Sequence, residues 1–130
     1  DLRSKCPAVY DQGQLGSCTA NALCGAVQFD KPFVCGSRLF VYYNERMLEN
    51  TIPDDAGAQI SDGIKTLEKY GVCPESEWPY NISKFKSKPN KKCYSDALKH
   101  KALQYQRVKQ VVLALLVLLL GLLMLKPQVH

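Results

Sequence analysis

Helical spacing of apolar residues begins near Ser17. A stripe at i, i+4 and i+7 predicts a helix over residues 17–29, with that stripe on its buried face. The stripe consists of Ala22, Ala26 and Phe29. The helix is expected to end at Lys31, because the residue before a proline avoids helical backbone. The preceding residues are expected to form extended coil and then a turn at residues 13–16.

Two further stripes predict helices over residues 37–48 and 59–70. Ser37 is expected to be the N-cap of the first helix, and Gly71 occupies the C′ position after the second. In the first helix, one face carries Phe40, Tyr43 and Met47 and another carries Glu45, Arg46 and Glu49. In the second helix, the buried stripe is Ile60, Ile64 and Leu67.

The pattern is less regular after Gly71. Residues 72–80 contain two prolines, which predicts a rigid, irregular segment. Ser95 is expected to cap a short helix that ends near His100. Alternation of polar and apolar residues over 103–107 predicts a short strand.

Composition supports one globular domain. The chain has 130 residues, of which 46% are hydrophobic and 22% are charged. These values exclude a disordered, collagen-like or coiled-coil protein. The formal net charge is +5, and seven lysines lie between Lys84 and Lys101 against Asp96 alone. Few aromatic residues interleave with these lysines, so a solvated loop is expected rather than a site for nucleic acid or another anionic partner.

Residues 111–125 form an apolar segment of different character, VVLALLVLLLGLLML. As a helix this segment would be about 22 Å long, short of the roughly 30 Å hydrocarbon core of a bilayer. It is therefore a marginal membrane helix, and a membrane anchor would make the protein membrane-associated. A frameshift, intron read-through or truncated gene is the favoured explanation, and a packed helix is a third. The expected division is residues 1–110 as the folded part, 111–125 as the apolar segment and 126–130 as a tail.

Candidate chemistry lies where a glycine-rich bend meets the first predicted helix. The sequence DQGQLGSCTA places Cys18 in the first helical turn. Free backbone N–H groups and the helix dipole at that end favour a nucleophilic thiolate. The Gln12 side chain and the Cys18 N–H are candidate donors to an oxyanion. Taken alone, a cysteine at this position would more often be a small buried residue on a core helix.

This motif resembles the signature of the papain-like cysteine peptidases, in which a Gln-Gly turn leads to Gly-Ser-Cys. Here the two parts are Gln12-Gly13 and Gly16-Ser17-Cys18. Other segments resemble the same family in the same order, and the resemblance covers about residues 1–108. These segments are Asp1–Arg3, Ser37–Arg46, Asp55–Ala58, Gly71–Glu75 and Trp78–Tyr80.

The resemblance implies an α+β papain-like fold, with a helical left domain around the nucleophile helix and a β-rich right domain that is missing or truncated. It also implies a peptide or protein substrate, no cofactor and no metal. The implied catalytic residues are Cys18 as nucleophile and Gln12 as oxyanion donor. The implied substrate-binding residues are Gly16, Ser17, Ala56, Gly57 and Ala58.

The chain departs from the family pattern in several places. Leu15 replaces the usual cysteine and Thr19 the usual aromatic residue, a form closer to the divergent bacterial, archaeal and viral branch. The family's catalytic His and Asn lie on its second domain, and neither His100 nor His130 has the matching context. The chain is therefore expected to be truncated and inactive alone. The alternative is a catalytically dead, membrane-tethered peptide-binding module.

The remaining reactive side chains are expected to be structural. The other five cysteines show no metal-binding spacing, and both free thiols and one or two disulfides fit their number. Asp62 and Glu75 are expected to face solvent or cap helices rather than to act as catalytic acids.

Overall fold

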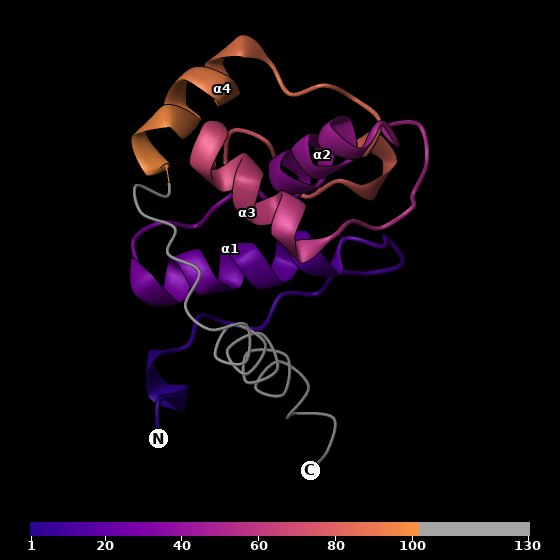
Figure 1. Ribbon diagram of the computed structural model, residues 1–130. Coiled ribbons are helices and arrows are strands. Elements are labelled where there is room, and N and C mark those ends of the chain that lie inside the picture. Colours follow the sequence, from indigo (N-terminus) through magenta and orange to yellow (C-terminus); the bar gives the residue numbers. More distant parts are fainter. Residues whose placement is uncertain (102–130) are drawn as a thin grey trace.

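The computed structural model describes residues 1–101, which fold as a group of helices (Figure 1). The helices are α1 (Cys18–Asp30), α2 (Arg38–Glu49), α3 (Ile60–Lys69) and α4 (Lys91–Ala97), with 3-10 turns η1 (Arg3–Lys5), η2 (Ile82–Lys84) and η3 (Leu98–His100). The described part has no strand, and its one isolated β-bridge pairs Gly36 with Pro74. A helical domain is thus confirmed. The predicted strand, the apolar segment 111–125 and any β-rich domain lie outside the described residues.

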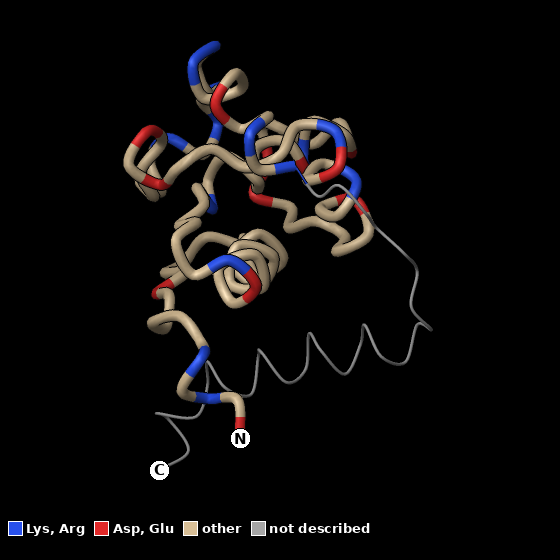
Figure 2. The backbone as a smooth tube through the Cα atoms, turned by 90° about the vertical axis from the view of Figure 1, so that its left-hand side faces the viewer, with Lys and Arg blue, Asp and Glu red and all other residues tan. Residues whose placement is uncertain are grey.

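The core forms where α2 and α3 pack together against α1 (Figure 1). Figure 2 shows the coil of α1 free of charged positions except at one end, where Asp30 and Lys31 lie. None of the helices within residues 1–101 combines the length and the apolar surface needed to cross a bilayer. The central helix α1 packs against both α2 and α3.

The buried face of α1 differs from the prediction. The fully or nearly fully buried positions are Ala20, Asn21, Leu23, Cys24 and Gly25, whereas Ala22, Ala26 and Phe29 are only half-buried. The predicted stripe was therefore wrong, although the bounds of the helix were right to within one residue. Small apolar residues surround this helix on most sides, so the sequence pattern could not select the face that α2 and α3 cover.

Helix α2 begins where the sequence predicted. The Ser37 hydroxyl accepts a hydrogen bond from the Phe40 N–H at 3.1 Å, which satisfies one of the free amides of the first turn. The helix ends at Asn50, which takes the left-handed conformation with φ +58°. Residues 39–46 are all buried, because neighbouring segments cover α2 on several sides.

The predicted polar face of α2 was wrong, since Glu45 and Arg46 are fully buried. The Arg46 guanidinium donates to the carbonyl oxygens of Ile52 and Phe85 and lies 4.2 Å from the centroid of the Tyr42 ring. Backbone carbonyls and an aromatic face thus replace the water that the cation loses on burial.

Helix α3 matches the prediction, with Ile64 and Leu67 buried and Ile60 packed at the edge of the same cluster. Gly71 follows with φ +76°. A Cβ atom at Gly71 would lie 1.9 Å from the Ala97 carbonyl oxygen. Glycine is therefore required here both for backbone conformation and for the close approach of α4.

Helix α4 begins earlier than predicted. Asn90, not Ser95, is its N-cap, and the Asn90 Oδ1 accepts from the Cys93 N–H at 2.9 Å. Ser95 lies inside the helix. The Lys84–Lys101 stretch is therefore partly helical instead of one loop, and two of its lysines, Lys92 and Lys99, pair with acidic side chains at the surface. The closest such ion pair joins Lys92 to Glu77 at 3.3 Å.

Candidate active site

The Cys18 thiol is exposed at the first residue of α1. The preceding Ser17 is fully buried, and its hydroxyl is 2.6 Å from the Tyr80 hydroxyl and accepts from the Asn21 side-chain amide at 3.0 Å. The Ser17 side chain therefore holds the backbone next to Cys18 in place and makes no capping hydrogen bond to the helix. The first backbone N–H groups of α1 have no intrahelical acceptor and remain available near the sulfur.

The bend before Cys18 is held by hydrogen bonds within the loop. The Asp11 carboxylate accepts from the N–H of Gly13, which has φ +66°. The Gln12 side-chain amide donates to the Leu15 carbonyl at 2.9 Å. An amide NH₂ group carries two hydrogens, so this bond uses one and leaves the other for a second acceptor.

Tyr80 connects both parts of the predicted motif. Its hydroxyl donates to the Gln12 carbonyl at 2.7 Å and contacts the Ser17 hydroxyl. One side chain from a segment more than sixty positions away thus fixes the spacing between the bend and the start of α1. Tyr80 was not among the predicted site residues, and its only sequence signal is its place in the Trp78–Tyr80 segment.

Arg38, the first residue of α2, also forms hydrogen bonds to this loop. Its Nη1 donates to the Asp11 carbonyl at 3.2 Å and to the Asn21 side-chain oxygen at 2.9 Å. The guanidinium lies 3.9 Å from the centroid of the Tyr80 ring. Arg38 therefore joins the loop, α1 and the residue 72–80 segment in one polar cluster, a role for which no sequence motif provides a direct signal.

Glu75 completes the cluster at the N-terminus of α2. Its carboxylate accepts from the Arg38 backbone N–H at 3.3 Å and the Tyr80 N–H at 3.0 Å, and lies 3.7 Å from Nη2 of Arg38. Burial raises the pKa of Glu75, while the Arg38 cation and the two amides oppose this rise. The prediction that Glu75 has a capping role is confirmed by these contacts. Asp62 lies in the first turn of α3 and pairs with Lys65 at 3.6 Å.

The segment Asp55–Ala58 lies beside the loop that carries Cys18. The Asp55 carboxylate accepts from the Gly16 N–H, with oxygens 2.9 and 3.1 Å from the nitrogen. The Tyr42 hydroxyl donates to Asp55 and accepts from the Gly57 N–H at 3.1 Å. The structure therefore brings Gly57 next to Gly16, and Asp55 is the group that joins the two segments.

A buried acid, Glu45, contacts the second residue of α1. The Glu45 carboxyl accepts from the Thr19 hydroxyl at 2.7 Å, and its other oxygen has no partner among the described residues. Burial raises the pKa of Glu45 to about 8; the Thr19 bond opposes the rise, and nearby Glu49 and Asp62 add to it. A carboxyl of this kind can stay protonated near neutral pH. The sequence pattern placed Glu45 on the face opposite the apolar stripe of this helix and gave no signal of its burial.

Two other groups lie away from this site. Cys73, Glu77 and Cys93 bring their ligand atoms within 4.8 Å of one another, a grouping of the type that can hold a metal ion. Their wide spacing in the sequence hid this proximity.

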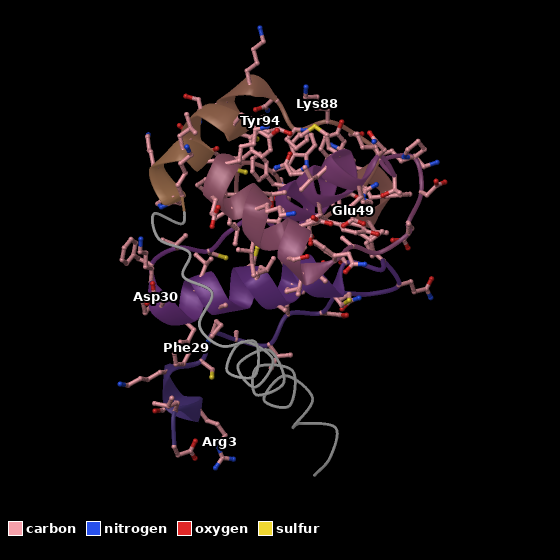
Figure 3. The ribbon with its side chains drawn as sticks, in the orientation of Figure 1. Arg3, Phe29, Asp30, Glu49, Lys88 and Tyr94 are labelled. Carbon is pink, nitrogen blue, oxygen red and sulfur yellow. The ribbon has the colours of Figure 1, made fainter. Side chains whose placement is uncertain are left out.

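The turn η3, which ends at His100, lies toward the Asp30 end of α1, far from the Cys18 end (Figures 1 and 3).

Comparisons with known proteins agree on one family. The chain is 51% identical over 104 residues to an uncharacterized peptidase C1-like protein of Acanthamoeba polyphaga mimivirus, a match that covers 75% of this chain and 33% of the relative. It is 42% identical to the solved structure of xylellain, a cysteine protease from Xylella fastidiosa, with a TM-score of 0.75. That match covers 92% of this chain and 55% of the xylellain chain. No protein-family model matches the chain.

Proposed function

Because the chain belongs to the papain-like cysteine peptidase family, we propose that it carries the nucleophile side of a peptidase that cleaves peptide bonds through a Cys18 thioester. The observation that carries this proposal is the exposed thiol at the first residue of α1, beside the Asp55–Ala58 segment. The chain spans 33% of the length of the mimivirus relative and 55% of the xylellain chain. Because these relatives are longer, the peptidase activity of the whole protein is proposed here along with the role of Cys18.

The chemical step begins when the Cys18 sulfur attacks the carbonyl carbon of the scissile bond. The carbonyl oxygen becomes an oxyanion, which the Cys18 N–H and the second Gln12 amide hydrogen stabilise. The intermediate collapses to a thioester as the amine leaves with a proton, and water then releases the carboxylic acid and the thiol. The hydrogen bond from the first Gln12 amide hydrogen to the Leu15 carbonyl holds the side chain in place. This fixed position supports the proposed role of the second amide hydrogen.

The group that moves the proton is proposed to lie outside residues 1–101. His100 is the only histidine among the described residues, and η3 lies toward the opposite end of α1. A helix of 13 residues is about 20 Å long, which is much too far for a hydrogen bond. Residues 1–101 are accordingly expected to bind an electrophile at Cys18 but to need a proton-transfer group from outside this part to turn over an unactivated peptide.

The substrate is proposed to be an extended peptide that runs along Asp55–Ala58. Ala56 is exposed and Gly57 has no side chain, so this segment presents its backbone to a strand-like ligand, apart from the Gly57 N–H, which already donates to the Tyr42 hydroxyl. A Cβ at Gly57 would lie 3.7 Å from the Gly16 carbonyl oxygen, so the Asp55–Ala58 segment contacts the loop that carries the nucleophile.

Selective labelling of Cys18 by a peptidyl epoxide tests this proposal. The full chain is incubated with the probe, and the modified cysteine is mapped by mass spectrometry. Cys18→Ser is expected to abolish the adduct. Cys35→Ser removes the other exposed cysteine and is expected to leave the adduct unchanged. Labelling of Cys18 and Cys35 at similar rates would contradict the proposal, because the thiol would then have no special environment.

A further inference from the structure

A second pair of thiols lies in the core, away from the candidate active site. Cys73 follows the turn after α3, and Cys93 is the third residue of α4. Both side chains are fully buried, and their sulfur atoms lie within 4.8 Å of each other. We propose that Cys73 and Cys93 form a disulfide bond that joins α4 to the residue 72–80 segment when the protein folds in the presence of a small-molecule disulfide.

The backbones on both sides of this pair are fixed by hydrogen bonds. The Cys73 carbonyl accepts from the Ser37 N–H at 2.8 Å, next to the bridge between Gly36 and Pro74. The Cys93 N–H donates to the Asn90 side chain at 2.9 Å. Because the two backbones are held in place, side-chain rotation is the motion left to bring the sulfurs together.

Apolar and aromatic side chains pack against the pair, and the Glu77 carboxyl group lies within 4.8 Å of both sulfur atoms. Cys73 and Cys93 form one buried cluster with Phe40 and Ala97. The Tyr94 ring, labelled in Figure 3, packs 4.9 Å from the Phe40 ring and 5.6 Å from the Tyr70 ring. An uncharged disulfide suits this environment, whereas two thiolates would lose their hydration without replacement.

A metal ion suits the same residues less well. Metal binding requires deprotonated thiols, and burial raises the pKa of Cys73 well above its ordinary value. The third potential ligand is Glu77, whose Oε1 already accepts from the Lys92 ammonium at 3.3 Å. That ammonium would place a positive charge beside a bound cation. The charge and polarity of the site therefore favour a sulfur–sulfur bond.

The oxidation proceeds by exchange with a disulfide such as oxidised glutathione. One cysteine thiolate attacks a glutathione sulfur, forms a mixed disulfide and releases one glutathione thiolate. The second cysteine thiolate then attacks the protein sulfur of the mixed disulfide and releases the other glutathione. The two cysteines lose two electrons, oxidised glutathione gains them, and the two thiol protons end on the released glutathione molecules. Since both cysteines are buried in the fold, exchange occurs during folding or local opening.

The linked peptides identify the bond directly. The full chain is refolded either with mixed reduced and oxidised glutathione or with reduced glutathione alone, alkylated in denaturant and digested with trypsin without reductant. Trypsin cleaves after Lys69, Lys84, Lys92 and Lys99, so the mixed-glutathione sample should give residues 70–84 joined to 93–99. The joined peptides should separate on reduction. Cys35→Ser is the matched control and should retain them, whereas Cys73→Ala should lose them.

Thermal unfolding provides a second readout, because it compares the oxidised and reduced forms of the wild-type chain and does not require the Cys73→Ala variant to fold. A disulfide across these twenty positions should raise the melting temperature of the wild type by about 10 °C over its reduced form. The Cys73→Ala/Cys93→Ala variant should melt at one temperature under both conditions. Alkylation of all six cysteines after refolding with oxidised glutathione would overturn the proposal. So would protection of both thiols by zinc that a chelator reverses, because that result would assign the pair to a metal.

Discussion

Glu45 shows at the residue scale how burial changes the chemistry of one side chain. Its carboxyl has no exposed surface and accepts one hydrogen bond, from Thr19. The nearby acids Glu49 and Asp62 disfavour its charge, and Arg46 offsets them only in part. The result is a pKa of about 8, so the folded protein holds a proton that the unfolded chain releases at lower pH.

Stability should therefore fall as pH rises through the titration of Glu45. In the unfolded chain this group ionises near pH 4.5, whereas in the folded protein it ionises near pH 8. The contribution of the protonated acid is complete below pH 4.5 and is lost as pH approaches 8, up to about 5 kcal/mol. Urea unfolding at pH 5, 7 and 9 measures this loss.

The Glu45→Gln variant should remove this part of the pH dependence, because an amide keeps the shape of the acid and an acceptor for Thr19 but does not titrate. Glu68→Gln, which changes an exposed carboxylate on α3, should retain the wild-type slope. If wild type and Glu45→Gln lose stability in parallel between pH 5 and 9, the acid is not buried as described.

At the scale of elements, the start of α2 holds the nucleophile loop. Arg38 contacts that loop, α1 and the Tyr80 ring, and its side chain is only 13% exposed. A lysine keeps the charge but cannot make the planar stack or donate from two nitrogens. Arg38→Lys should therefore cost about 2 kcal/mol of unfolding free energy and slow the labelling of Cys18 by a peptidyl epoxide.

The matched control for Arg38→Lys is Arg3→Lys, since Arg3 pairs only with exposed Asp1 in the described part of the chain. That change should alter stability by less than about 0.5 kcal/mol. Urea unfolding and labelling kinetics measure both variants. Unchanged labelling and stability in Arg38→Lys would contradict a supporting role for the guanidinium.

The contact between α4 and the end of α3 depends on a glycine. Gly71→Ala places a Cβ in a left-handed conformation and 1.9 Å from the Ala97 carbonyl oxygen, so the backbone itself must move. The expected cost exceeds about 2 kcal/mol. Gly57→Ala has a similar positive φ, but its Cβ would meet only the Gly16 carbonyl oxygen at an ordinary contact distance of 3.7 Å, and it should cost about 1 kcal/mol. Equal melting temperatures for the two variants would show that the Gly71 contact is not tight.

Helix bounds could be read from the sequence where a periodic stripe met a clear cap. Ser37 and Gly71 marked the ends of α2 and α3 correctly, because each acts through local backbone geometry. The start of α4 was missed, since Asn90 and Ser95 are both good N-caps and the stripe was too short to choose between them. The burial of Arg46 was unpredictable, because its carbonyl partners at Ile52 and Phe85 come from distant loops.

For the whole molecule, the candidate site is where segments far apart in the sequence meet. The local motif identified Gln12 and Gly16 to Cys18, because the bend and the helix start are contiguous. It could not identify Asp55 or Tyr80, whose hydrogen bonds join that bend to the rest of the fold. The three-helix core thus provides a rigid base, and the polar contacts of the loops determine how the thiol is presented.

We propose that this arrangement makes Cys18 a site of acyl transfer. The mass of the full chain after reaction with a nitrophenyl ester of a short peptide, whose leaving group departs without needing a proton, tests this proposal. One acyl group is expected, bound to Cys18 as a hydroxylamine-sensitive thioester, present in Cys35→Ser and absent in Cys18→Ser. Acylation divided evenly between Cys18 and Cys35, or absent from Cys18, would contradict it.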